Sequence, residues 1–193
     1  GLRHVVITSV TRDDLLDGAQ WAIEGLAWVR KDRVGIIGGS YGGYMVHCAI
    51  TRYPDAFRCA VAGCGDTDIY ESYQHGDRPG RLDLWQQMGD PEANRELYRK
   101  ASPLFQVEDI QTPLLVTHGT ADTSVVPLMT KLLAEAMRGQ KKFHEVKWYE
   151  GQGHSRGTPE NAQDSLERTL RFLDLHLKGE GQDIPAMYAP DKA

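Results

Sequence analysis

The sequence predicts an α/β fold with a mainly parallel sheet flanked by helices. Apolar runs and helical patterns alternate about five times along the chain. Two of the runs, near residues 34–37 and 113–118, show no polar alternation, which is typical of strands covered on both faces. The 193 residues, 40% hydrophobic and 25% charged, suffice for one domain with a buried core.

In the first half, the apolar residues Val5 to Ile7 predict a strand at residues 4–9, and helical spacing predicts a helix over residues 11–26. A strand follows at residues 34–37. The next helix runs over residues 45–53 and ends at Pro54, and a further strand lies near residues 59–62.

In the second half, residues 65–110 are irregular to helical and rich in aromatics, with a short helix over residues 91–100. A buried strand (113–118), a helix (128–136) and a half-covered strand around Val146 and Trp148 come next. The last helix has apolar positions at Ala162, Leu166, Leu170, Leu173 and Leu177. We expect one domain over residues 1–178 and a loose tail over residues 179–193.

Composition excludes several classes of protein. No apolar run approaches the ~18 residues of a membrane span, and a mean hydropathy of −0.47 agrees. The 27 acidic and 22 basic residues give a net charge of −5, which disfavours a nucleic-acid binder. Cys48, Cys59 and Cys64 form neither a CxxC nor a zinc pattern, so we expect small buried thiols and no metal. Free thiols without a signal peptide favour a cytoplasmic location.

The first chemical motif is Gly-Gly-Ser-Tyr-Gly at residues 38–42, a match to G-x-S-x-G. It stands between a predicted strand and a predicted helix, the context of a nucleophile elbow. We expect a side chain at Gly38 or Gly42 to collide with nearby backbone, and Ser40 to be strained beside a helix N-terminus. The alternative is a phosphate-binding turn, but the run lacks a P-loop lysine and a dinucleotide fingerprint.

Two further motifs follow later strands. His-Gly-Thr-Ala-Asp at residues 118–122 places Asp122 where it can orient a histidine, although a turn or capping acid is the alternative. Glu-Gly-Gln-Gly-His at residues 150–154 places His154 in a loop suited to a general base. His118 ends an apolar strand and fits a structural role, whereas position alone leaves His75 open.

The three candidates occur in the order Ser40, Asp122, His154, which is the chain order of the α/β-hydrolase triad. Each follows a separate predicted strand. Because parallel strands bring their carboxyl ends to one edge, the order and spacing together predict an α/β-hydrolase fold with a nucleophilic serine.

The chain resembles the catalytic domain of the prolyl oligopeptidase (S9) family of serine peptidases, in the branch of dipeptidyl and acylaminoacyl peptidases. The resemblance covers roughly residues 11–178. It rests on the motifs above together with runs at residues 32–36, 39–44, 88–91, 101–103 and 118–127.

The resemblance implies Ser40 as nucleophile, Asp122 as orienting acid and His154 as base. The backbone N–H of Tyr41 would be one oxyanion donor, as the elbow geometry also suggests. It further implies a substrate pocket lined by Cys64, Tyr70 and Val125, and more weakly by Tyr73, suited to proline, alanine or another uncharged side chain. Ordinary packing under a loop remains the alternative for both tyrosines.

Family members carry a β-propeller and several strands before the elbow, and their second oxyanion donor comes from that part. Here one predicted strand and one helix precede residue 38, so we expect the carboxyl-terminal part of a longer hydrolase that lacks its first strands. The leading hypothesis is a cofactor-free hydrolase that cleaves short peptides through an acyl-enzyme. An esterase or thioesterase, a fragment that is inactive without an N-terminal chain or domain, and an oligomer remain open.

Overall fold

The computed structural model of the chain describes residue 27 and residues 30–154 and 157–178. The strand predicted at residues 4–9, the helix over residues 11–26 and the tail over residues 179–193 lie outside the described residues.

The described strands form one parallel sheet in the order β1 (Gly35–Gly39), β2 (Cys59–Gly63), β3 (Leu114–Gly119) and β4 (His144–Tyr149). All four strands therefore end at the same edge, and the loops that begin there are neighbours. This confirms the α/β class and the four strands predicted between residues 34 and 148.

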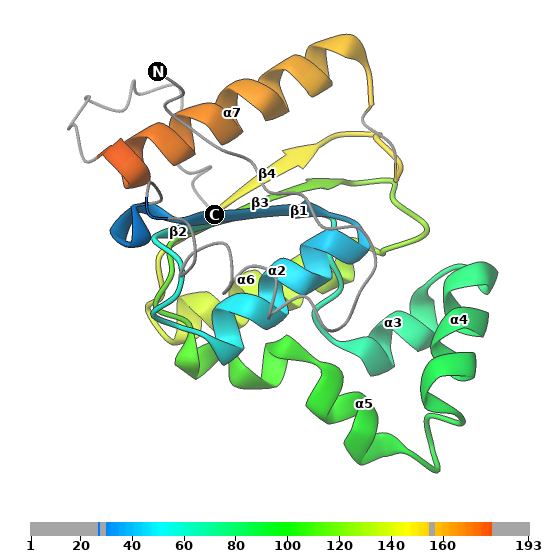
Figure 1. Cartoon of the computed structure of the whole chain (residues 1–193). Helices are drawn as coiled ribbons and strands as arrows, with labels where there is room; N and C mark the ends of the chain where they lie inside the picture. Colours follow the sequence, from blue (N-terminus) through cyan, green and yellow to red (C-terminus); the bar gives the residue numbers. More distant parts are fainter. Residues whose placement is uncertain (1–26, 28–29, 155–156, 179–193) are drawn as a thin grey trace.

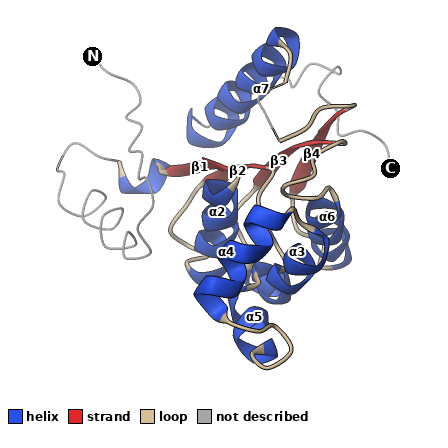
Figure 2. Ribbon diagram, turned by 90° about the vertical axis from the view of Figure 1, so that its right-hand side faces the viewer, coloured by secondary structure: helices blue, strands red, loops and turns tan. Residues whose placement is uncertain are grey.

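Helices cover both faces of this sheet (Figures 1 and 2). On one face lie α2 (Tyr41–Arg52) and α6 (Leu128–Gly139), and on the other lies α7 (Pro159–Lys178). A short 3-10 turn, η1 (Lys31–Arg33), precedes β1. Of the helices that the structure describes, none combines the length and the hydropathy that a membrane span needs.

The segment between β2 and β3 is largely helical, as expected. It contains α3 (Ile69–His75), α4 (Arg78–Met88), α5 (Arg95–Ala101) and the 3-10 turn η2 (Pro103–Asp109). Aspartates start two of the helices. The carboxylate of Asp68 accepts hydrogen bonds from the backbone N–H groups of Tyr70 and Glu71 in α3, and that of Asp77 accepts one from the first turn of α4.

The start of α5 differs from the sequence prediction of a helix from residue 91. The side chain of Asp90 accepts hydrogen bonds from the backbone N–H groups of Glu92 (2.8 Å) and Ala93 (3.0 Å). This local bonding favours a turn over a helix, so residues 91–94 form turns and the helix begins at Arg95.

The core has two layers, one on each side of the sheet. Ala60 and Ala62 of β2 pack with Val46 of α2 and Leu133 of α6, whereas the alternate residue Val61 faces the opposite layer. That second layer joins β2 and β3 to α7 through Cys59, Val61, Leu115 and Phe172. Both faces of the central strands β2 and β3 are buried, as the apolar run at residues 113–118 predicts. The same prediction for residues 34–37 is wrong, because β1 lies at the edge of the described sheet and its Ile37 is 49% exposed.

The apolar face of α7 is placed differently from the predicted stripe. Leu173 and Leu177 pack against the sheet, but Leu166 is 59% exposed and Leu170 is 53% exposed. Phe172, which the periodicity did not single out, is the buried anchor of this helix. The helix exists where the period of 3.6 predicts it, but the buried direction is set by the sheet beneath it.

Candidate active site

Ser40 stands at the sharp turn between β1 and α2, as the motif predicts. Its backbone has φ 57° and ψ −123°, a conformation that residues other than glycine rarely adopt. The backbone N–H of Ser40 donates to the carbonyl of Gly63 at the end of β2 (2.8 Å). The strained turn is thus tied to the neighbouring strand, and the serine side chain projects from the edge of the sheet.

Gly38 makes this turn possible, because a Cβ there would overlap the backbone carbonyl of Gly42. The expectation of a similar collision at Gly42 is wrong, since a Cβ at that position would meet nothing within 4 Å. The Gly42 backbone occupies the place where a Cβ on residue 38 would lie, so this contact requires a glycine at position 38 but not at position 42.

The loops after β3 and β4 are joined to each other, and this brings Asp122 and His154 together. In the sheet, His118 is paired with Trp148 and Gly119 with Tyr149, so the two loops begin side by side. The backbone N–H of Ala121 donates to the carbonyl of Gln152 (2.9 Å). A Cβ on Gly119 would overlap that same carbonyl, so the contact between the loops requires a glycine there.

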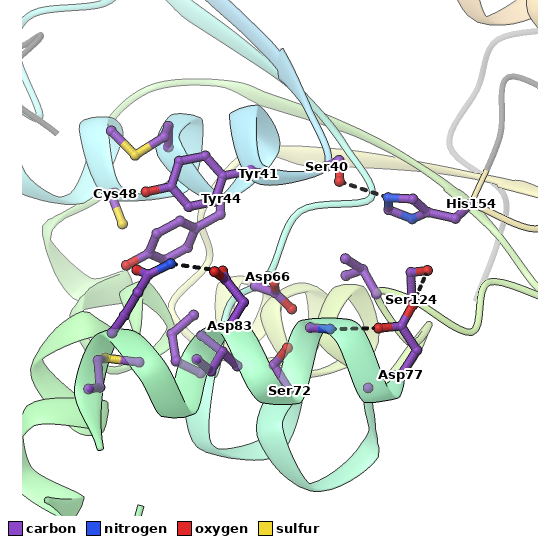
Figure 3. Close-up of a pocket in the computed structure, with 18 of the residues that line it drawn as sticks. Ser40, Tyr41, Tyr44, Cys48, Asp66, Ser72, Asp77, Asp83, Ser124 and His154 are labelled. Carbon is purple, nitrogen blue, oxygen red and sulfur yellow. Dashed lines mark hydrogen bonds between the residues drawn. The ribbon is translucent and has the colours of Figure 1, made fainter. Parts of the chain in front are cut away.

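Ser40, His154 and Asp122 form one chain of hydrogen bonds. Ser40 Oγ lies 2.7 Å from His154 Nε2, and His154 Nδ1 lies 2.7 Å from Asp122 Oδ2 (Figure 3 shows the first contact). With the proton on Nδ1 donated to the carboxylate, Nε2 is left to accept the serine proton. The Asp122 side chain is fully buried, while that of His154 is 28% exposed.

Asp122 is fixed by more than the histidine. Its Oδ1 accepts hydrogen bonds from the backbone N–H groups of Ser124 (2.9 Å) and Val125 (3.0 Å). Burial by itself would raise the pKa of Asp122, but hydrogen bonds from His118, His154 and the Val125 backbone outweigh it and lower that pKa. The group therefore remains a carboxylate able to stabilise an imidazolium.

The competing histidines make contacts that fit structural roles. His118 Nε2 lies 3.4 Å from Asp122 Oδ2, but this ring has closer partners in the core. His118 Nε2 donates to the carbonyl of Val125 (2.8 Å), and its Nδ1 lies 2.7 Å from the hydroxyl of Thr130. Both ring nitrogens are used in the core, which matches the structural role expected for this residue. His75, which position left open, lies 3.2 Å from Glu71 on α3.

A cavity of about 390 Å³ opens beside Ser40 and His154, between α2 and the α3–α4 segment (Figure 3). Tyr41 and Val125, both predicted for the site, line it. Tyr41 is the first residue of α2, so its backbone N–H stands at the positive end of the helix dipole. Cys64, also predicted for the pocket, is not among the described residues that line this cavity. Its Sγ instead lies within 4.8 Å of a carboxylate oxygen of Asp122 and a ring nitrogen of His154.

Tyr70 and Tyr73 are not among the described residues that line this cavity. The Tyr70 hydroxyl donates to Glu92, and the Arg95 guanidinium lies over the Tyr70 ring. Tyr73 makes an edge contact with the ring of Tyr98. The packing alternative for these tyrosines thus has direct contacts in its favour, and their role in substrate binding stays a prediction.

The cavity has an acidic wall that the sequence did not indicate. Asp66, Asp77 and Asp83 line it, with Arg52 as a basic residue among them. Burial raises the pKa of Asp66, and its Oδ1 has no hydrogen-bond partner among the described residues. No motif marks Asp66, because it follows β2 in a segment without recognisable periodicity.

A serine on a strained strand-to-helix turn, bonded through histidine to a buried aspartate, defines a serine hydrolase of the α/β-hydrolase fold. Residues 8–180 match the sequence model of the Prolyl oligopeptidase family. The chain belongs to this family of serine peptidases, which confirms the resemblance seen in the motifs.

Relatives agree with this placement. The chain is 31% identical over 178 residues to dipeptidyl aminopeptidase BIII of Pseudoxanthomonas mexicana, an alignment that covers 89% of the chain and 26% of the relative. It is 30% identical to human dipeptidyl peptidase 8, over 86% of the chain and 18% of the relative. The solved acylaminoacyl peptidase of Pyrococcus horikoshii superimposes with a TM-score of 0.83 at 25% identity, over 91% of this chain and 29% of that one. The chain thus spans between 18% and 29% of the length of these relatives.

Proposed function

We propose that this chain is the part of a serine peptidase that performs acyl transfer, with Ser40 as nucleophile, His154 as general base and Asp122 as orienting acid. The observation that supports it most directly is the pair of 2.7 Å contacts that join the three residues. Membership in the Prolyl oligopeptidase family makes a peptide bond the expected target.

The reaction follows from the proton positions. Ser40 Oγ attacks the peptide carbonyl carbon while its proton passes to His154 Nε2, and Asp122 stabilises the imidazolium through Nδ1. The carbonyl oxygen gains negative charge beside the first N–H groups of α2, including that of Tyr41. The C–N bond then breaks, and the amine leaves with the proton from His154. Water attacks the resulting ester in the same way and releases the acid.

We further propose short peptides as substrates, because the cavity is small and closed on one side by α3 and α4. A dipeptidyl peptidase and an acylaminoacyl peptidase are among the relatives of this chain, and both names denote action near a peptide terminus. A cytoplasmic location stays a proposal that rests on three free cysteines, Cys48, Cys59 and Cys64.

The test is covalent labelling of the full chain with a fluorophosphonate probe, which reacts with an activated serine. We expect one label per chain, located at Ser40 by peptide mass. His154→Ala should abolish labelling because no base remains to take the serine proton. A Ser40→Ala variant that is labelled as well as the wild type would refute the assignment of the nucleophile.

Turnover of an aminoacyl nitroanilide compared with a nitrophenyl ester tests the target bond. Amide cleavage that disappears with Ser40→Ala supports a peptidase, whereas ester hydrolysis alone would assign an esterase. If the chain is labelled only after an upstream segment of the natural protein is added, the chain is a part whose oxyanion site is completed elsewhere.

A further inference from the structure

Three side chains of types that can bind a metal ion lie close together in the site, and the proposed acyl-transfer reaction uses only two of them. Cys64 offers a thiol, Asp122 a carboxylate and His154 an imidazole, and one ligand atom from each lies within 4.8 Å of the other two. Sulfur, nitrogen and oxygen from these residue types are the ligands that Zn²⁺ prefers in proteins. We propose that Cys64, Asp122 and His154 form an inhibitory binding site for Zn²⁺.

The separation suits a tetrahedral ion after a small movement. Zinc bonds of about 2.3 Å to sulfur and about 2.0 Å to nitrogen or oxygen place two ligands about 3.5 Å apart. Cys64 Sγ lies within 4.8 Å of the other two ligand atoms, so it needs to approach them by no more than about 1.5 Å. His154 Nδ1 and Asp122 Oδ2 are already 2.7 Å apart and must separate by about 0.5 Å to admit the ion between them. Asp122 is fixed by two backbone N–H groups, so the movement falls to the Cys64 side chain and to His154.

Cys64 is held in the right place by its backbone. Its φ of 38° lies in the left-handed region, and its N–H donates to the carbonyl of Thr117 on β3 (2.8 Å). Burial and the nearby carboxylates raise the pKa of the thiol, so without metal Cys64 is a neutral thiol beside the triad. A coordinating metal deprotonates such a thiol, and the proton leaves to solvent. The partial exposure of His154 leaves the fourth position open to water.

Zinc at this position would block the proposed reaction. A metal bound to His154 takes the lone pair that must accept the Ser40 proton, or displaces the proton that orients the ring on Asp122. The metal site itself stands on the geometry of the three ligands. Its inhibitory effect rests on the proposed function, so the two are tested by separate measurements.

The first measurement is metal binding to the full chain, with no substrate present. Titration with Zn²⁺ against a chromophoric chelator should show one site per chain, and Cys64→Ser should weaken it at least tenfold by removing the sulfur ligand. Cys59→Ala is the matched control, because that thiol is buried under α7 on the other face of the sheet and should leave the affinity unchanged. Equal affinities in the wild type and Cys64→Ser would overturn the proposal.

Cobalt gives a second readout that does not depend on affinity. Co²⁺ in the same site should produce a thiolate charge-transfer band that Cys64→Ser removes and Cys59→Ala retains. A cobalt spectrum without this band would also overturn the proposal. Fluorophosphonate labelling of Ser40 should fall at saturating Zn²⁺ and recover with chelator. If Ser40 is never labelled but zinc binds through Cys64, the proposed function fails while the metal site stands.

Discussion

Because the backbone at Ser40 is strained, we expect glycine to be more stabilising than alanine at this position, the opposite of their order at an ordinary helical position. We compare Ser40→Gly with Ser40→Ala, because both variants remove Oγ and its hydrogen bond to His154. The two differ only in whether residue 40 carries a Cβ at φ 57° and ψ −123°. Their difference in stability therefore isolates the strain of the elbow from the chemistry of the serine.

The magnitude follows from two opposing terms. A residue other than glycine in such a conformation costs about 1–3 kcal/mol. Glycine loses more conformational freedom on folding than alanine, which costs roughly 0.5–1 kcal/mol. We therefore expect Ser40→Gly to exceed Ser40→Ala by about 1 kcal/mol in the free energy of unfolding. For a chain of this size, this corresponds to roughly 3 °C in Tm.

Urea denaturation of both variants measures this difference. Lys131 supplies the control, because it lies exposed on α6 with ordinary helical geometry. There Lys131→Gly should be about 1 kcal/mol less stable than Lys131→Ala. If Ser40→Gly is no more stable than Ser40→Ala while the Lys131 pair behaves as expected, the elbow stores no strain and the reasoning fails.

Three further variants test the rest of the site. Gly119→Ala would place a Cβ against the Gln152 carbonyl and displace the histidine loop, so labelling of Ser40 should fall about 10²-fold with a smaller change in Tm. Asp122→Asn should reduce turnover by about 10⁴-fold with the fold retained, because an amide cannot stabilise the imidazolium. Folding lowers the pKa of Asp122, so the ionised carboxylate contributes to the stability of the wild type at any pH above the unfolded-state pKa of about 3.9. This contribution is lost as the pH falls from about 3.9 through the folded-state pKa. The stability advantage of the wild type over Asp122→Asn should therefore disappear in that range of pH. His118→Ala leaves the buried Val125 carbonyl and Thr130 hydroxyl without this partner and should lower the free energy of unfolding by about 2–4 kcal/mol, measured by urea denaturation.

Periodicity predicted the described elements well where burial is uniform. The strands β2 and β3 fall on the apolar runs at residues 59–62 and 113–118, and the sheet is covered on both faces there. β1 also falls within two residues of the run predicted at residues 34–37, but it lies at the edge of the described sheet, so Ile37 is exposed. Periodicity predicted less well those features that local hydrogen bonds or neighbouring elements determine, such as where a helix begins and which of its faces is buried. The Asp90 side chain delays the start of α5, and the sheet rather than the helical period determines that Leu166 and Leu170 are exposed.

The triad could be proposed from sequence because each member follows a strand that ends at the same edge. The cavity could not, since its wall comes from α3 and α4, whose position depends on packing that no motif encodes. Asp66 is the clearest case, because only the fold places this carboxylate in the same cavity as Ser40. Cys64 was expected in the substrate pocket, but its closeness to two triad side chains depends on the left-handed turn after β2.

That turn links the two halves of the site. The carbonyl of Gly63 accepts the N–H of Ser40, and the next residue, Cys64, donates its own N–H to Thr117 on β3. The strained elbow on one side and the strand leading to Asp122 on the other are thus joined through two consecutive residues. A side chain at position 64 must therefore lie beside both Asp122 and His154, whatever its chemistry. Because the residue there is a cysteine, the same turn that organises the serine site also brings a third metal ligand to it.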